Sequence, residues 1–444
     1  QGYKPVRINH LGDWGKQFGM LIVAYKKWGS EEAVKANPIN ELLQLYVRIN
    51  AEAEEDPSVD EEAREWFRKL EAGDEEATAL WQWFRDESDR ILKEYGNHPS
   101  FCMMAYGNEP GGANQATYLS GLIDYWKSKD LRRVYTSAGG WPYVENADYW
   151  DPMEPRIQRW GEGMNSIINA QQPRTDFDFA DIIRKNMPTV SHEVGQWCVY
   201  PNFKEIEKYT GVLKAKNFEI FQETLKEHHM ADLANDFLFA SGRLQTLCYK
   251  ADIEGALRTP GFAGFQLLDL HDFPGQGTAL VGVLDPFWEE KGYVTPEEYS
   301  TFCNKTVPLV RFPKMVWLNN ETLNVPLEVA HFGEKPLQAA NITWEISNQA
   351  GEKIAQGNFV KDLPVTNCIP AGNIEYPFSG IEKPTQLVVS AEVKETGSKN
   401  QWNIWVYPAK QETVDKQPYI TSALDNQAMS DTTVVLTRTI LFYY

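Results

Sequence analysis

Two glutamates follow apolar segments of the kind that form buried strands. In residues 97–110 (NHPSFCMMAYGNEP), an apolar run leads into Asn108 and Glu109. In residues 188–201 (PTVSHEVGQWCVYP), Glu193 ends a second such run, with His192 before it. Taken alone, either glutamate has an ordinary structural explanation, such as capping the next helix. Together they supply the two carboxylates that acid–base and nucleophilic chemistry require.

A pair of carboxylates at one face of a barrel is suited to cleaving glycosidic bonds. In the retaining form of this reaction, one carboxylate is the nucleophile and the other is the proton donor and then the base, with the two groups roughly 5–5.5 Å apart. Trp197 and Tyr200 follow Glu193 closely and could stack against a sugar ring. The two segments therefore predict a sugar-cleaving site.

Up to about residue 318, short apolar runs alternate with longer amphipathic stretches, which is typical of repeated βα units. Such units would position the two glutamates. Residues 61–95 and 217–257 are the clearest helical stretches. This alternation predicts a (β/α)-type barrel, which gathers catalytic groups at the carboxyl ends of its strands. The expected strands are PVRI near the start, MLIVAY at 20–25, FCMMAY at 101–106, RRVYTSA at 132–138, TVSHEV at 189–194 and GFAGFQLLDL at 261–270.

The segment NHPSFCMMAYGNEP resembles the acid/base motif of glycoside hydrolase family 2, which begins Asn-His-Pro-Ser and ends Gly-Asn-Glu. The resemblance implies a (β/α)8 barrel, here without its first strand. It implies that Glu109 is the acid/base, that Asn108 binds the 2-hydroxyl of the sugar and that Glu193 is the nucleophile. VRINH similarly resembles the end of the family's second strand, where Arg7 would orient the nucleophile and His10 would line the pocket.

The stretch at 264–293 resembles the loop after the eighth strand of that family. Gln266, Asp269 and His271 are expected to bind substrate together with His192 and Trp197. A metal held by His271 and Asp272 is a minor alternative, and the mechanism requires neither a metal nor a cofactor. The family's usual tryptophan near this strand end is missing, because the sequence has Gln266-Leu267-Leu268 there.

The sequence pattern changes near residue 318, where segments of alternating polar and apolar residues are separated by turn residues. We therefore expect a barrel domain at 1–318, an immunoglobulin-like β-sandwich at 319–408 and a tail at 409–444. The sandwich is expected to support the barrel rather than to catalyse. Its aromatic residues alternate as core positions do, and they are Trp344, Trp402, Trp405 and Tyr407.

Composition narrows the function classes further. The net charge of −19 argues against a nucleic-acid partner, and no apolar run is long enough to span a membrane. Five widely spaced cysteines argue against a disulfide framework and a zinc site. The N-terminus resembles a processed or truncated end, and a secreted or periplasmic location is favoured if a signal peptide precedes it. Homo-oligomerisation is left open.

The sequence therefore predicts a retaining, exo-acting β-glycosidase that takes part in polysaccharide degradation. A β-galactoside is the favoured substrate and a β-glucuronide is next, since arginines before Glu193 could bind a uronate carboxylate. Those arginines are Arg156, Arg159 and Arg174, and a surface role explains them equally well. The alternatives are a carbohydrate-binding relative that has lost turnover and an endo-acting enzyme.

Overall fold

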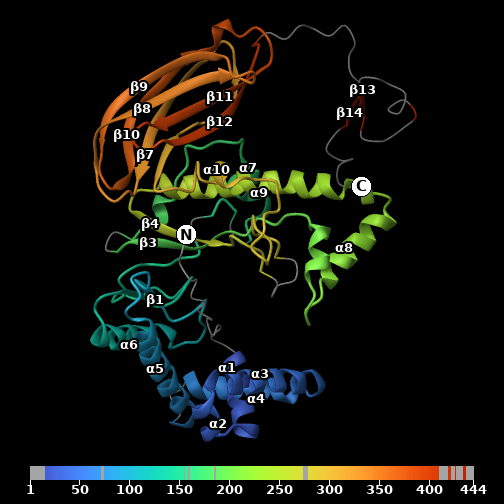
Figure 1. The fold of residues 1–444 in the computed structure, drawn as a ribbon, viewed down its shortest axis with the longest axis vertical. Coiled ribbons are helices and arrows are strands. Elements are labelled where there is room, and N and C mark those ends of the chain that lie inside the picture. Colours follow the sequence, from blue (N-terminus) through green and yellow to red (C-terminus); the bar gives the residue numbers. More distant parts are fainter. Residues whose placement is uncertain are drawn as a thin grey trace.

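A computed structural model describes residues 16–71, 75–154, 156–158, 161–184, 187–273 and 279–409, together with 419–421, 426 and 434–436. It is a mixed α/β structure with a β-rich C-terminal region, as predicted (Figure 1). Among the described residues, no helix is both long and apolar enough to cross a membrane. All five cysteines lie in this part of the chain, and none forms a disulfide there.

Five helices form the N-terminal region: α1 (Lys16–Trp28), α2 (Glu31–Ala36), α3 (Pro38–Glu55), α4 (Ser58–Glu71) and α5 (Glu75–Tyr95). The prediction of a strand at 20–25 is wrong, because these residues lie within α1. Ile22, Val23 and Ala24 are buried against α3 and α4. A short run of consecutive apolar residues fits a buried helix face as well as a buried strand, and packing against two neighbouring helices decides between them here.

Four short strands follow, in two parallel pairs. The first pair is β1 (Met103–Ala105) with β2 (Val134–Thr136), and the second is β3 (Thr189–Gly195) with β4 (Phe262–Leu268). All four were predicted as strands. The closed eight-stranded barrel is not found among the described residues, because these strands form separate two-stranded sheets. Residues 5–8, the expected strand PVRI, lie outside the described part of the chain.

Helices connect and cover these strands. They are α6 (Gln115–Lys129), α7 (Ile167–Ala170), α8 (Lys216–Glu227), α9 (Ala234–Leu257) and α10 (Pro296–Tyr299). Short 3₁₀ helices lie at η1 (Gly163–Asn165), η2 (Ala180–Ile182), η3 (Phe203–Lys208), η4 (Ala231–Leu233) and η6 (Phe378–Gly380). The long helix α9 lies between the strand pair β3–β4 and the C-terminal sheets (Figure 1).

The C-terminal region is a sandwich of two sheets. One has the order β10-β7-β5 and the other β6-β12-β11-β8-β9. Their bounds are β5 (Thr306–Val310), β6 (Val316–Leu318), β7 (Thr322–His331), β8 (Leu337–Asn348), β9 (Lys353–Leu363), β10 (Thr366–Pro377), β11 (Thr385–Val393) and β12 (Ser398–Tyr407). A short parallel pair, β13 (Tyr419–Thr421) and β14 (Val434–Leu436), lies in the tail.

The sandwich core is apolar and continuous, and it includes Trp402 and Phe378. Side chains alternate along β12, so that Trp402, Ile404 and Val406 are buried whereas Trp405 and Tyr407 are exposed. Trp402 is therefore a core residue as predicted. The core prediction is wrong for Trp405 and Tyr407, because their odd spacing from Trp402 puts them on the opposite face of the sheet.

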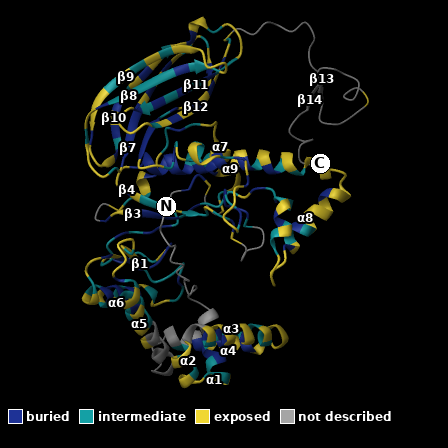
Figure 2. Ribbon diagram, viewed as in Figure 1, coloured by how far each residue is buried: buried dark blue, intermediate teal, exposed yellow. Residues whose placement is uncertain are grey.

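The sandwich is joined to α9 by a buried polar network around Glu254. This carboxylate accepts hydrogen bonds from Lys250 Nζ at 2.5 Å and from Arg258 at 3.2 Å on its own helix. It also accepts from Asn400 Nδ2 at 2.8 Å and Trp402 Nε1 at 3.0 Å, both on β12. The half of α9 beneath the sandwich is buried, while its other half carries many exposed residues (Figure 2).

Candidate functional site

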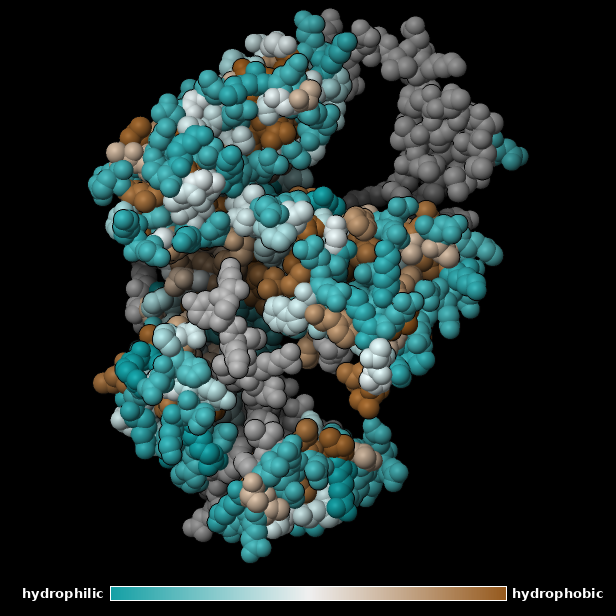
Figure 3. Space-filling view, in the orientation of Figure 1, coloured by the Kyte–Doolittle hydropathy of each residue, from teal (hydrophilic) through white to brown (hydrophobic). Residues whose placement is uncertain are grey.

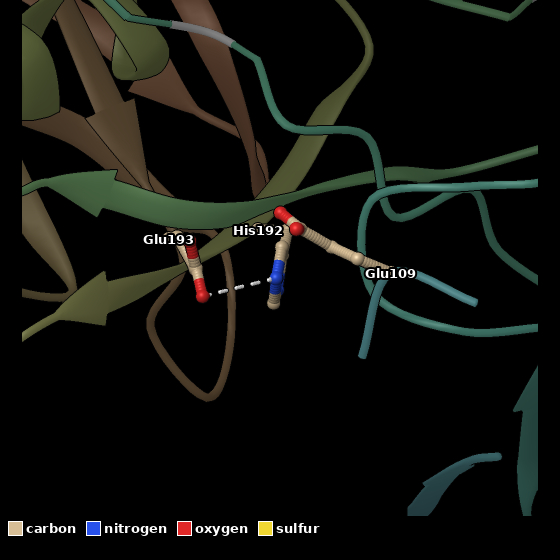
Figure 4. A group of neighbouring side chains, drawn as sticks. All are labelled: Glu109, His192 and Glu193. Carbon is tan, nitrogen blue, oxygen red and sulfur yellow. Dashed lines mark ion pairs between the residues drawn. The ribbon is translucent and has the colours of Figure 1, made fainter. Parts of the chain in front are cut away.

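Glu109, His192 and Glu193 come together between the two strand pairs (Figure 4). Glu109 lies in the loop after β1, where its backbone N–H donates to Gly139 O at 2.9 Å. His192 and Glu193 lie on β3, where the N–H of His192 donates to Pro152 O at 2.8 Å. One ligand atom from each of the three side chains lies within 4.8 Å of the others.

The backbone at both glutamates is in the left-handed region, with φ of 41° at Glu109 and 54° at Glu193. L-residues rarely adopt this conformation, and it recurs where a site requires a particular side-chain direction. Gly139 and Gly140 form one wall of the site. A Cβ on Gly139 would lie 2.6 Å from Cε1 of His192, so the close approach of this loop requires glycine.

Glu193 is held from one side through a single oxygen. Its Oε2 accepts a hydrogen bond from Gln196 Nε2 at 2.8 Å and lies 3.6 Å from Arg156 Nη2. Its Oε1 lies 3.4 Å from His192 Nε2. Burial alone would raise the pKa of Glu193, but His192 and Arg156 outweigh it and hold the pKa below its usual value. Glu193 is therefore an anion at neutral pH.

A second layer of polar residues supports His192. Its Nδ1 lies 3.4 Å from Gln266 Oε1, and Gln266 Nε2 donates to Asp151 Oδ2 at 3.4 Å. Burial raises the pKa of Asp151 to about 7, against the opposing effects of His192 and Gln266. Burial alone would lower the pKa of His192, but the contact with Glu193 and the charge of Asp151 raise it.

Several residues predicted for the site lie elsewhere or make other contacts. Trp197 donates to Asp252 at 2.8 Å, Asp269 accepts from the N–H of Leu270, and His271 contacts Asp272 O and the Trp288 ring. Their predicted binding roles rested on order along the loop, which does not determine where a side chain points. Asp272, the other half of the minor metal alternative, pairs with buried Lys291. Arg7, His10 and Arg159 lie outside the described residues, and Arg174 pairs with Asp176.

Asn108 stays beside the site through its backbone bridge to Gly139, and its buried Oδ1 has no hydrogen-bond partner among the described residues. Sequence reasoning missed Asp151, which follows Trp150 in a segment that bridges to β3. Arg156 was treated as a uronate-binding or surface residue, yet it is 5% exposed and faces Glu193. An acidic and a basic residue close together in the chain, in the irregular segment after β2, were the available clue to both.

Two family models match different parts of the chain. The family described as tRNA synthetases class I (R), catalytic domain, matches residues 1–132. A Domain of unknown function (DUF8488) matches residues 321–408 in the sandwich. The first match includes Glu109 but ends before β3, which carries His192 and Glu193.

Curated relatives of high identity are arginine–tRNA ligases. The ligase of Streptococcus thermophilus (strain ATCC BAA-491 / LMD-9) is 91% identical over 192 residues, which cover 41% of this chain and 32% of the ligase. The ligase of Streptococcus agalactiae serotype III is 87% identical over 187 residues, with the same shares. The ligase of Streptococcus pyogenes serotype M5 is 63% identical over 184 residues, or 40% of this chain and 31% of the ligase. The chain spans about a third of the length of these relatives.

The similar solved structures are glycoside hydrolases, but the similarity is low. The β-D-mannosidase of Dictyoglomus thermophilum has a TM-score of 0.41 and 15% identity, covering 73% of this chain and 40% of that one. The exo-chitosanase of Amycolatopsis orientalis has a TM-score of 0.41 and 12% identity, covering 75% and 39%. Scores at this level do not establish a shared fold.

The prediction of a β-glycosidase acting on a carbohydrate substrate is contradicted by the ligase relatives and by the family match at 1–132. Two carboxylates at strand ends indicate where chemistry could occur, but not which reaction occurs there. The exclusion of nucleic acid is contradicted by the same findings, since tRNA is named in the relatives' activity. A net charge describes the whole chain and conceals local clusters of the opposite sign. By sequence, part of this chain is therefore similar to arginine–tRNA ligases.

Proposed function

We propose that this chain acts in joining arginine to tRNA, and that its N-terminal region carries that role. The observation that carries the proposal is the 91% identity over 192 residues with an arginine–tRNA ligase. The family match at residues 1–132 supports assigning the role to the helices α1–α5 and the segment after them. His192 and Glu193 on β3 lie beyond this match, whereas Glu109 lies within it, and the proposal requires none of the three.

The N-terminal helices offer basic side chains suited to contact with RNA. On α1 and α3, the Arg48 guanidinium lies 3.8 Å from the centroid of the Trp28 ring. On α1 and α4, Lys26 Nζ lies 3.8 Å and Lys69 Nζ 4.4 Å from the Trp66 ring. Trp66 is itself buried in the helical core, so the cations would make the contact, since cations bind phosphates and arginine planes stack on unpaired bases. We call Lys26, Lys27, Arg48 and Lys69 the basic cluster.

The negative charge of the whole chain restricts where RNA could bind. A net charge of −19 repels phosphates over most of the surface, which is largely hydrophilic (Figure 3). Binding of tRNA must then depend on a few local cations and weaken steeply as salt rises. Acidic neighbours also restrict the basic cluster, because Glu52 pairs with Lys27 at 2.5 Å. A small footprint on the RNA is therefore expected.

Binding of tRNA to the full chain tests the proposal. Filter binding is measured with purified tRNA at low salt for the unchanged chain, for Arg48→Glu and for Lys399→Glu. Lys399 is a matched control, since it is an exposed cation on β12 of the sandwich. We expect Arg48→Glu to weaken binding at least tenfold and Lys399→Glu to leave it unchanged. Absence of binding at low salt, or equal effects of the two changes, would contradict the proposed role of the N-terminal region.

A further inference from the structure

We propose that Glu109, His192 and Glu193 bind a divalent first-row transition metal, with Zn²⁺ as the preferred ion. The ligands are one imidazole nitrogen and two carboxylate oxygens, all within 4.8 Å of one another. This inference departs from the metal-free site expected from the sequence. It also goes beyond the proposed ligase function, because two of the three ligands lie on β3, outside the family match at residues 1–132.

The spacing of the ligand atoms fits one small ion. Zinc binds nitrogen and oxygen ligands at about 2.0–2.2 Å in tetrahedral geometry, which places two ligands about 3.4 Å apart. His192 Nε2 and Glu193 Oε1 are separated by 3.4 Å. The ligand atom of Glu109 lies within 4.8 Å of the other two, so binding of one ion would require it to move closer. Three protein ligands leave a fourth position for water or another oxygen ligand.

The unsatisfied nitrogen of His192 is the independent observation that indicates a ligand. His192 is 9% exposed, and its Nε2 makes no well-formed hydrogen bond among the described residues, although Glu193 Oε1 lies 3.4 Å away. Gln266 donates its amide to Asp151, so its oxygen is directed to His192 Nδ1 and accepts a hydrogen from it. The lone pair of the imidazole is then on Nε2. A second-layer contact of this kind, which fixes the tautomer, is typical of metal-binding histidines.

Glu193 is oriented in the same way. Gln196 and Arg156 occupy the side of Oε2, whereas Oε1 faces His192 Nε2. The two carboxylates carry two negative charges when ionised, which one divalent ion balances, while Arg156 holds Glu193 from the side of Oε2. The nitrogen ligand favours zinc and other late first-row metals over magnesium, calcium and manganese, which prefer oxygen ligands.

Metal titration of the full chain tests this proposal. Chelator-treated protein is titrated with Zn²⁺ by calorimetry, and with Co²⁺ by visible absorption as a probe of ligand geometry. We expect one Zn²⁺ per chain, Co²⁺ bands of tetrahedral type, and at least a hundredfold loss of affinity in His192→Asn and Glu193→Gln. His228→Asn is the matched control, since this exposed histidine ends α8 and should change nothing.

Two further variants keep the test decisive. If a change on β3 prevents folding, Glu109→Gln in the loop after β1 should show the same loss. Gln266→Leu should weaken Zn²⁺ binding about tenfold through the orientation of His192. No zinc binding, or zinc binding that is equally strong in Glu109→Gln, Glu193→Gln and His192→Asn, would overturn the proposal.

Discussion

The N-terminal helices and the junction between α9 and the sandwich use charged residues in opposite ways. In the helices, ion pairs such as Lys35 with Glu31 and Arg64 with Glu61 lie one turn apart and are largely exposed. At the junction, Glu254 is 1% exposed and Arg258 is fully buried, and the network spans two regions of the chain. Exposed pairs are screened by water and salt, whereas a buried charge depends on every partner it has.

The largest effect should follow from breaking the junction. In Glu254→Ala, Lys250 and Arg258 keep their charges but lose the carboxylate that compensates them. Removing one partner of a buried ion pair costs about 3–5 kcal/mol. Chemical denaturation should register this loss. A cost no larger than that of a surface change would show that the junction does not hold the sandwich to α9.

A buried carboxylate without partners should make stability depend on pH. Glu205 in η3 is fully buried, neither oxygen has a hydrogen-bond partner among the described residues, and burial raises its pKa from 4.5 to about 7. Between pH 4.5 and 7, the folded chain retains a proton that the unfolded chain has lost. The contribution of Glu205 to stability is therefore greatest below this window and falls by about 3 kcal/mol as the pH rises through it.

Glu205→Gln isolates this contribution. Asp151 and Asp252 also have pKa values raised to about 7 by burial, so part of the pH dependence should remain in the variant. The difference in unfolding free energy between the unchanged chain and the variant should shift in favour of the variant as the pH rises. A difference that is constant from pH 4 to 8 would contradict the assignment.

Packing rather than charge should determine the stability of the N-terminal helices. A Cβ on Gly19 of α1 would lie 1.8 Å from the backbone oxygen of Ala63 on α4. Gly19→Ala should therefore separate the two helices and cost about 1–3 kcal/mol in thermal or chemical unfolding. Gly121→Ala on α6 is the control, since a Cβ there meets nothing within 4 Å and should be neutral or slightly stabilising. Equal effects would contradict the close α1–α4 contact.

The smallest effect is expected for an exposed pair. Glu31→Gln removes the partner of Lys35, at 2.6 Å on the surface of α2. Solvent screening should leave the midpoint of thermal unfolding unchanged within error. A clear loss of stability would mean that exposed ion pairs of the N-terminal helices contribute as much as the buried network between α9 and the sandwich, contrary to the difference expected between them.

Sequence reasoning recovered local structure better than tertiary arrangement. The apolar runs before Glu109 and through Glu193 did predict β1 and β3, because buried strands require such runs. The run at 20–25 was misassigned to a strand, since packing of α1 against α3 and α4 determines its form. The prediction of a closed barrel was wrong, because local periodicity does not specify which strands pair.

The candidate site was predicted in part. Glu109, His192, Glu193 and Gln266 do lie together, but the supporting Asp151 was missed and Arg156 was not recognised as buried beside Glu193. These two residues belong to an irregular segment before β3, where no periodic pattern indicates the direction of a side chain. The reaction could not be derived, because a carboxylate pair is compatible with several kinds of chemistry.

The most direct test of the central claim is the formation of arginyl-tRNA by the full chain. Purified protein is incubated with radiolabelled arginine, ATP and tRNA, and acid-precipitable label is counted, with labelled lysine as the control amino acid. The account predicts tRNA-dependent incorporation of arginine, absence of lysine incorporation, and a strong reduction in Arg48→Glu but not in Lys399→Glu. Absence of arginine incorporation by a folded chain, or incorporation that Arg48→Glu leaves unchanged, would contradict the proposed role of the N-terminal region.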